Sequence, residues 1–283
     1  MHSVEAPGRK LQVELEAVPE TLLWTLYHRA VEARRADAVL DDPMAVELVD
    51  AIDYPFEARF GSGAGGHAQW QALRVRCFDG EVERFLAGHP DGTVVALGEG
   101  LETQFWRVDN GRVRWLTVDL PETVALRRRL LPPSPRHRMV GRSALDPSWM
   151  AEVDASRGVL LTAQGLLMYF EYDEVRRLVA ACAEWFPGGA LLFDAVPCWL
   201  SLRSRSGKLN GPGSYRSPPW HWGIDSQTAK DLAGAHPNVA ELRELRLPRG
   251  RGAALGYMVP LVSGVPPLRR RLPISVLLAR FGR

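Results

Sequence analysis

Residues 94–100 read VVALGEG, a short apolar run, rich in β-branched side chains, that ends in two glycines. Such a run is typical of a buried strand, and glycine lets the backbone turn tightly and pass close to a ligand because it lacks a Cβ. The next strand-like run, residues 113–120, ends beside Asp119, whose carboxylate can accept hydrogen bonds from the two hydroxyls of a ribose. The pattern predicts a nucleotide-type crevice.

Two phosphate-binding motifs are absent from the sequence. A dinucleotide fold requires a third glycine at position 103, where this chain has Thr103. There is no Walker-type loop, since Gly207-Lys208 follows no strand. Taken alone, Gly98 and Gly100 fit an ordinary strand-to-helix turn as well as they fit a ligand site.

The downstream sequence predicts an α/β fold. We expect strands at 93–98, 113–120, 158–170 and 188–197. A helical pattern over 172–186 separates the last two, and strands that alternate with helices predict a parallel sheet covered on both faces. Residues 239–283 are expected to complete this sheet.

The first ninety residues have a different character. Residues 20–60 show helical spacing, with a restart at Asp42-Pro43, and GSGAGG at 61–66 predicts a mobile loop before a further helix that ends at Gly88. We therefore expect a helical N-terminal cap, residues 1–90, and a core, residues 91–283. Within the core, residues 198–226 are rich in Ser, Gly, Pro and aromatics and predict a loop-rich lid insertion.

Composition favours a small-molecule partner. The 35 basic and 33 acidic residues nearly cancel, to a net charge of +2, so no strong field attracts nucleic acid. Three separated cysteines and the lack of paired metal-ligand motifs argue against disulfides and a metal site. The N-terminus has no apolar signal region, and no apolar run is long enough for a bilayer, so we expect a cytoplasmic protein without membrane contact.

Three ordered segments and the lead-in carry a family resemblance. VVALGEGLETQFWR, VDLPETVALRRRLLP and AQGLLMYF, preceded by PETLLWTLYHRAVEARRADAVLDDPMAVEL, resemble the leucine carboxyl methyltransferase-like family, particularly its bacterial branch associated with polyketide O-methylation. The resemblance covers residues 18–250. It implies a Rossmann-like class I methyltransferase sheet, with S-adenosylmethionine (SAM) as cofactor and S-adenosylhomocysteine as product.

The resemblance also implies roles for individual positions. Arg74 matches the arginine that pairs with the methionyl carboxylate of SAM, although a solvated helix arginine is the plain alternative. The stretch 143–146 matches the segment that lines the adenine, and a loop with a helix N-cap at Asp146 or Ser148 competes with that interpretation. Gln164 lies beside the methionyl amine. The cofactor-binding positions are Arg74, Gly98, Glu99, Gly100, Asp119, Leu120, Ser143, Ala144, Leu145, Gln164 and Gly165.

This chain departs from the family pattern at three places. Glu99 replaces a small residue, Glu102-Thr103-Gln104 replaces Asp-Thr-Arg, and Gln164 replaces a glutamate. Glu99 could therefore serve as the acidic partner of the cofactor's amine or sulfonium, or it could weaken binding by opposing the cofactor's carboxylate. The sequence leaves both alternatives open.

The acceptor side is less defined. A carboxylate acceptor needs no base, whereas a phenol or enol does. Tyr169 and His221 are the catalytic candidates, and Tyr27, Tyr169, Trp220 and His221 the substrate-contact candidates. Packing in a helix or anchoring of a loop is the alternative for each, and also for His28, a further candidate base.

We expect an O-methyltransferase that acts on a carboxylate or hydroxyl of a small aromatic or polyketide-like metabolite. Methyl-esterification of a protein C-terminus is a second hypothesis, and a SAM-binding protein that transfers no methyl group is a third. The oligomeric state is open, with a homodimer among the alternatives.

Overall fold

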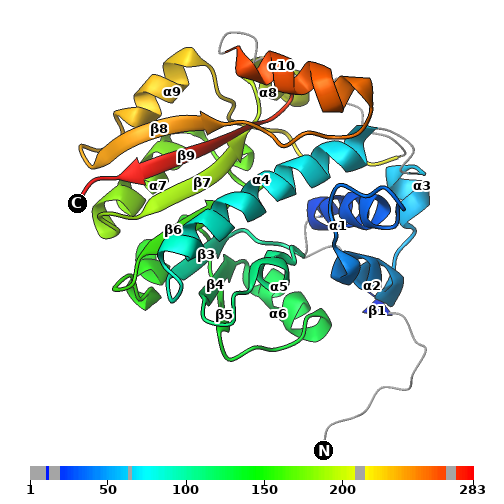
Figure 1. Ribbon diagram of the computed structural model, residues 1–283, viewed down its shortest axis with the longest axis horizontal. Helices are drawn as coiled ribbons and strands as arrows, with labels where there is room; N and C mark the ends of the chain where they lie inside the picture. Colours follow the sequence, from blue (N-terminus) through cyan, green and yellow to red (C-terminus); the bar gives the residue numbers. More distant parts are fainter. Residues whose placement is uncertain (1–10, 13–19, 63–65, 208–213, 266–271) are drawn as a thin grey trace, which may run out of the picture.

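The computed structural model describes residues 11–12, 20–62, 66–207, 214–265 and 272–283. Its centre is a seven-stranded sheet in the order β5-β4-β3-β6-β7-β9-β8 (Figure 1). The strands are β3 (Thr93–Leu97), β4 (Arg114–Asp119), β5 (His137–Gly141), β6 (Val159–Ala163), β7 (Ala190–Ala195), β8 (Val239–Leu245) and β9 (Ser275–Phe281).

The first five strands of that order are parallel, whereas β9 runs antiparallel between β7 and β8. All five residues of β3 are buried, which is expected of a central strand that is apolar from Val94 to Leu97. From β3 the chain moves to β4 and β5 on one side and then returns to β6 on the other. The carboxyl end of β3 is therefore a topological switch point, where open α/β sheets bind their ligands.

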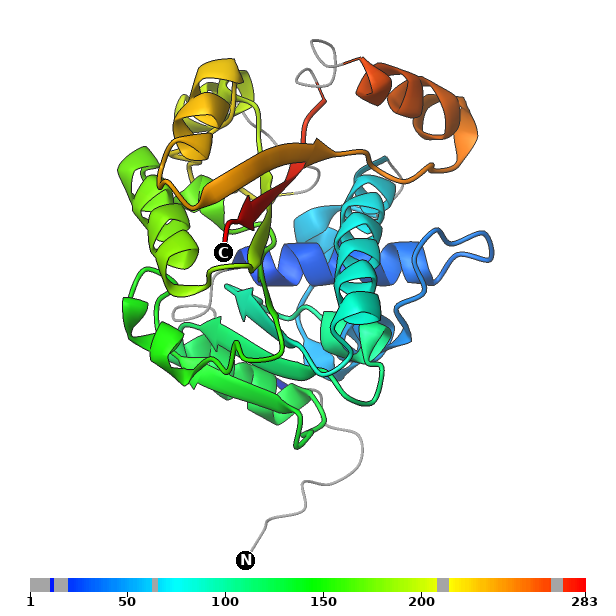
Figure 2. The same cartoon turned by 60° about the vertical axis from the view of Figure 1, so that its left-hand side comes forward.

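Helices cover both faces of the sheet, as the sequence predicted (Figure 2). On one face, α7 (Tyr172–Trp185), α9 (Ser226–Ala233) and the 3₁₀ turn Pro147–Glu152 pack on alternate strand residues such as Val95 and Leu97. On the other face, α4 (Gly66–Gly88) and α5 (Gln104–Val108) pack on Val94 and Ala96. A further helix, α6 (Pro121–Leu130), follows β4.

A helical layer precedes the sheet. It contains α1 (Glu20–Ala33), α2 (Pro43–Ala51) and α3 (Phe56–Phe60), with α1 packed along α4. The restart predicted at Asp42-Pro43 is confirmed, because the Asp42 carboxylate accepts a hydrogen bond from the Ala45 amide and caps α2. The layer also holds a two-stranded pair that we did not expect, β1 (Leu11–Gln12) with β2 (Ile52–Asp53).

The predicted loop at 61–66 lies partly outside the described residues, since 63–65 are not described. Gly66 already belongs to α4, so this helix begins earlier than its apolar pattern indicated. Its end at Gly88 is confirmed. The division of the chain at residue 90 stays a prediction.

Two other sequence predictions were wrong in detail, and one strand was missed. The strand expected over 158–170 ends at Ala163, because Gly165 takes a φ of 69° and a 3₁₀ turn, Leu167–Tyr169, follows. The edge strand β5 was missed. The region expected to be loop-rich begins with α8 (Cys198–Arg205). The C-terminal region completes the sheet with β8 and β9 as predicted, and it also contains the π-helical turn Ala254–Met258 and α10 (Val259–Gly264).

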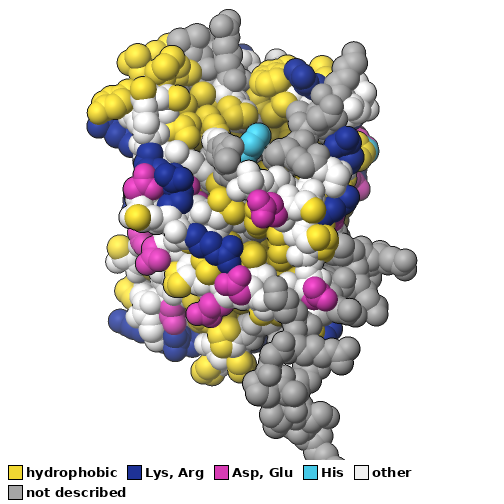
Figure 3. Space-filling model, turned by 90° about the vertical axis from the view of Figure 1, so that its right-hand side faces the viewer, with side chains coloured by type: hydrophobic (Ala, Val, Ile, Leu, Met, Phe, Trp, Pro, Cys, Tyr) yellow, Lys and Arg dark blue, Asp and Glu magenta, His cyan; other side chains and the backbone are white. Residues whose placement is uncertain are grey.

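Several large apolar side chains on α8 and near α10 are exposed. They include Trp199, Leu202, Tyr257, Met258 and Leu261. Figure 3 shows hydrophobic side chains gathered in the upper part of one face, the part of the molecule that holds α8 and α10 in Figure 1. Within the described residues, no helix combines the length and apolar character needed to cross a membrane.

Candidate active site

A cavity of about 670 Å³ opens at the carboxyl ends of the central parallel strands. Residues that follow β3, β4, β6 and β7 form its floor, and α1 and α4 form one wall. This is the switch point of the sheet, so the crevice predicted from residues 94–100 exists in the fold.

The turn after β3 depends on its glycines. Gly98 and Gly100 have φ angles of 58° and 55°, which residues with a Cβ rarely adopt. A Cβ on Gly98 would lie 2.6 Å from the Leu166 side chain. The turn therefore brings bare backbone to the edge of the cavity.

Asp119 closes this turn from the end of β4. Its Oδ2 accepts a hydrogen bond from the Gly100 amide at 2.7 Å, and its Oδ1 accepts one from the Leu120 amide at 2.8 Å. Burial raises the pKa of the Asp119 carboxyl, while these two amides oppose that rise. The carboxylate lines the cavity with its orientation fixed, and each oxygen keeps capacity for a further donor.

Arg74 reaches the same cavity from α4. Its Nη1 donates a 2.9 Å hydrogen bond to Oδ2 of Asp194, a fully buried carboxylate in β7 whose Oδ1 accepts from the Gly165 amide at 2.6 Å. Arg74 is itself only 4% exposed, and its Nε has no partner among the described residues. The arginine is thus a positioned, buried cation and not a solvated surface group.

Gln164 follows β6 and faces Glu102. Its Nε2 donates to Oε2 of Glu102 at 3.0 Å, whereas its Oε1 is buried with no partner among the described residues. An unpaired buried acceptor costs about 1–3 kcal/mol. A donor on a ligand in the cavity would satisfy it.

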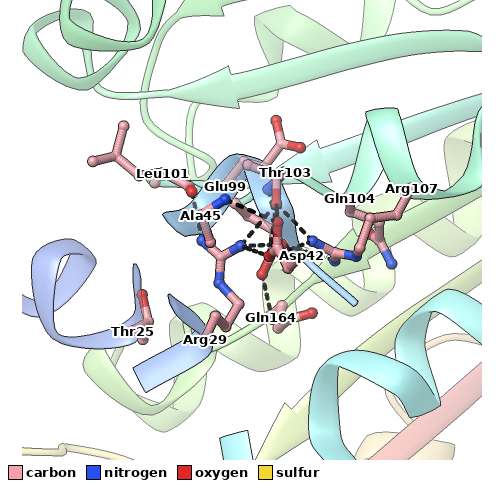
Figure 4. Close-up of polar contacts among 12 residues, drawn as sticks. Thr25, Arg29, Asp42, Ala45, Glu99, Leu101, Thr103, Gln104, Arg107 and Gln164 are labelled. Carbon is pink, nitrogen blue, oxygen red and sulfur yellow. Dashed lines mark hydrogen bonds and ion pairs between the residues drawn. The ribbon is translucent and has the colours of Figure 1, made fainter. Parts of the chain in front are cut away.

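Glu102 belongs to a buried ionic network that joins the N-terminal layer to the sheet. Figure 4 labels Arg29, Asp42 and Arg107 of this network. Arg29 of α1 contacts Asp42 at 2.5 Å and Glu102 at 3.1 Å, and Arg107 of α5 contacts Glu102 at 2.8 Å. Arg107 also pairs with Asp79 and Asp42. Burial alone would raise the pKa of Glu102, but the charges of Arg29 and Arg107 lower it to about 2.

Glu99 points to a different set of partners. Its carboxylate pairs with Arg127 at 2.8 Å and accepts hydrogen bonds from the Thr117 hydroxyl and the Trp115 indole. Burial raises the pKa of Glu99, and Arg127 opposes that rise. Glu99 lines the cavity with its carboxylate already held by these partners, and its contact with a cofactor stays a prediction.

Only part of the segment 143–146, which was predicted to line the adenine, lies at the cavity. Ser143 and Ala144 line the cavity, whereas Leu145 packs against the core and does not. The competing prediction of an N-cap is also confirmed, because Asp146 accepts from the Ser148 amide at 2.9 Å. Leu120 lines the cavity and is 38% exposed at its edge.

Two of the predicted acceptor-side residues line the cavity and two do not. Tyr169 and Trp220 line it. His221 is outside, on the surface, with its Nδ1 2.9 Å from Glu171. Tyr27 is buried in the helical layer and donates to the Gly61 carbonyl at 2.8 Å. The structure therefore brings neither Tyr27 nor His221 to the cavity, and it does not support the substrate roles predicted for both or the catalytic role predicted for His221.

The structure adds residues to the acceptor side that the sequence analysis missed. They are Trp24, His67, Trp70, Gln71, Tyr215 and Ser217. One signal was readable: His67, Trp70, Gln71 and Arg74 have the spacing of one helix face. Trp24 and Tyr215 stack with ring centroids 6.2 Å apart. These residues are far apart in the sequence, so residue spacing could not predict the contact.

Comparison with known proteins decides the family. The family model "Leucine carboxyl methyltransferase" matches residues 23–183. The chain is 36% identical over 214 residues to the tetracenomycin polyketide synthesis O-methyltransferase TcmP of Streptomyces glaucescens, covering 75% of this chain and 77% of that one. It is 29% identical over 205 residues to the S-adenosyl-L-methionine-dependent methyltransferase dpfgK of Gibberella zeae, covering 66% and 68%.

The chain belongs to the leucine carboxyl methyltransferase family. The cofactor of these class I methyltransferases is SAM, and the residues present fit its amino-acid end. Arg74 would hold the methionyl carboxylate, and the unpaired Oε1 of Gln164 would accept from the methionyl ammonium.

The nucleoside end of the cofactor fits as well. The fixed carboxylate of Asp119 would accept from the ribose hydroxyls, and the turn at Gly98 and Gly100 lines the cavity beside it. In this protein, Ser143 and Ala144 stay the predicted contacts to the adenine.

Proposed function

We propose that the protein is a SAM-dependent O-methyltransferase whose acceptor is a small aromatic, polyketide-like molecule. The observation that carries the proposal is the aromatic part of the cavity. Beyond the cofactor-binding residues, Trp24, Trp70, Tyr169, Tyr215 and Trp220 line one continuous space. Flat aromatic walls suit a planar acceptor, which can stack on them.

The relatives support the same acceptor class. TcmP is named for O-methylation in polyketide synthesis, and this chain matches about three quarters of it. The reaction itself needs little from the protein beyond alignment. Bound SAM supplies an electrophilic methyl group, while the cavity holds the acceptor oxygen in line with it and keeps water away.

Calorimetry followed by an acceptor screen tests the proposal. We expect micromolar binding of SAM and S-adenosylhomocysteine, and methylation of planar aromatic acceptors that carry hydroxyl or carboxyl groups. Binding without turnover would favour a protein that uses the cofactor without transferring methyl. Methylation of a peptide C-terminus in place of small acceptors would favour the protein-modifying activity.

A further inference from the structure

The glycine turn after β3 has an anchor that lies outside the cavity. Arg127, in the last turn of α6, is fully buried and does not line the cavity. Its Nη1 donates to the Gly100 carbonyl at 2.6 Å and to the Glu102 carbonyl at 3.0 Å. One guanidinium nitrogen therefore binds the turn at two points of its backbone.

Both backbone polar groups of Gly100 are bound by side chains from other elements. Its amide donates to Oδ2 of Asp119 at 2.7 Å, and its carbonyl accepts from Arg127. The next carbonyl, that of Leu101, accepts from Arg29 at 2.6 Å. Because the Gly100 amide holds one oxygen of Asp119, the position of this glycine affects how the carboxylate is oriented in the cavity.

Glu99 holds the guanidinium of Arg127 in place. Its Oε2 lies 2.8 Å from Nη2 of Arg127. The same carboxylate accepts hydrogen bonds from the Thr117 hydroxyl and, at 3.2 Å, from the Trp115 indole. A buried guanidinium without a counter-ion is strongly unfavourable, so Glu99 allows this cation to lie in the core while its other terminal nitrogen binds the carbonyls.

We propose that Arg127 is a positioning residue for the cofactor and that Glu99 is its counter-ion. Arg127 fixes the turn at Gly100, and the Gly100 amide fixes the Asp119 carboxylate that is assigned to the ribose. Arg127 thus acts on cofactor binding without touching the cofactor. The inference takes SAM as the occupant of the cavity, and to that extent it rests on the proposed function.

Charge-matched variants test the proposal. Arg127→Met leaves the Glu99 charge buried and unpaired, whereas Arg127→Met combined with Glu99→Gln removes both charges. We expect the urea midpoint to fall in the single variant and to recover toward the wild-type value in the double variant. Calorimetric binding of S-adenosylhomocysteine should stay ~10–100-fold weaker in both, because the Gly100 and Glu102 carbonyls have lost a charged donor. The control is Arg129→Met, an exposed neighbour on α6, which should match the wild type in both measurements.

Arg127→Lys provides a second measurement in case the methionine variants do not fold. Lysine keeps a positive charge beside Glu99, but a single ammonium lacks the fork that reaches the carboxylate and both carbonyls. We expect a urea midpoint near that of the wild type and ~10-fold weaker binding of S-adenosylhomocysteine. In the Asp119→Ala background the same substitution should weaken binding little further, because Arg127 acts through that carboxylate.

The outcomes separate this proposal from the function on which it rests. A wild type that binds no S-adenosylhomocysteine contradicts the proposed function, and the positioning role with it. A wild type that binds, together with an Arg127→Lys variant of equal affinity, contradicts the positioning role alone. The same holds if affinity recovers along with stability in the double variant, since Arg127 would then only compensate the charge of Glu99. Fully additive losses from Arg127→Lys and Asp119→Ala would also overturn the proposed route through Asp119.

Discussion

The amide nitrogen of Gln164 donates to the carboxylate of Glu102 at 3.0 Å, which leaves the amide oxygen as the unpaired atom. Since the carboxylate can only accept, it fixes which end of the amide is free. The family glutamate is thus replaced here by a neutral amide with a negative charge behind it. This arrangement can still recognise an ammonium group.

The first prediction concerns this pair. Glu102→Gln removes the charge and lets the Gln164 amide reverse, so we expect ~10-fold weaker binding of S-adenosylhomocysteine, the scale of one hydrogen bond to a charged group. Binding of decarboxylated S-adenosylhomocysteine, which keeps the amine, should weaken by the same factor. Binding of 5′-methylthioadenosine, which lacks the amine, should be unchanged. Uniform weakening of all three ligands in calorimetry would show general damage to the site.

Asp119→Ala provides the second prediction. It removes the acceptor assigned to the ribose, and we expect SAM binding to weaken by about 1.5–3 kcal/mol. Because burial raises the pKa of this carboxyl, wild-type affinity should already fall on mild acidification, as protonation removes the charge. Asp225→Asn, at the exposed cap of α9, is the control. Unchanged affinity in Asp119→Ala would contradict the pocket assignment.

The third prediction concerns the buried network. Arg29→Met leaves Asp42 and Glu102 short of a positive partner in a site from which water is excluded, so we expect a loss of about 3–5 kcal/mol in the free energy of unfolding. Urea unfolding measures it. Arg34→Met, in the turn directly after α1, breaks an exposed pair with Asp50 of α2 and should cost less than about 1 kcal/mol. Similar losses in the free energy of unfolding for the two substitutions would contradict a stabilising role of the buried network.

The fourth prediction is a stability profile with two acid steps. Burial lowers the pKa of His137 to about 3, below the ordinary 6.5, so the unfolded chain binds a proton first and stability falls as the pH drops below about 6.5. Glu102, whose pKa is lowered from 4.5 to about 2, stabilises the fold above pH 4.5, and that contribution is lost as the pH falls toward 2. Chemical unfolding from pH 8 to 3 measures both steps, and a flat profile would contradict them.

The sheet was predictable where strand residues are buried on both sides. Residues 94–97 and 190–193 are apolar throughout, so their sequence alone identifies central strands. The edge strand at 137–141, HRMVG, gave no such signal, because an edge strand buries little of its length. The helix at 198–205 was obscured by its serines and arginines, whose spacing shows no clear apolar face.

The cofactor end of the site was predictable because it follows local sequence order at the ends of strands. The acceptor end was not, since it is assembled from α1, α4 and the segment around Tyr215, which meet only in three dimensions. Asp194 illustrates the difference, because in the sequence it only interrupts an apolar run. In the fold, β7 places its carboxylate where it accepts hydrogen bonds from Arg74 and from the Gly165 amide.

Helix α4 is continuous from Gly66 to Gly88. One face of it lines the cavity with Arg74, which is assigned to the cofactor, and with residues 67, 70 and 71, which are assigned to the acceptor side. Exchange of the whole N-terminal cap with a relative would therefore replace the cofactor's arginine together with the acceptor wall, and would cut the Arg74–Asp194 pair at the junction. Acceptor range is better altered by point changes at residues 67, 70 and 71.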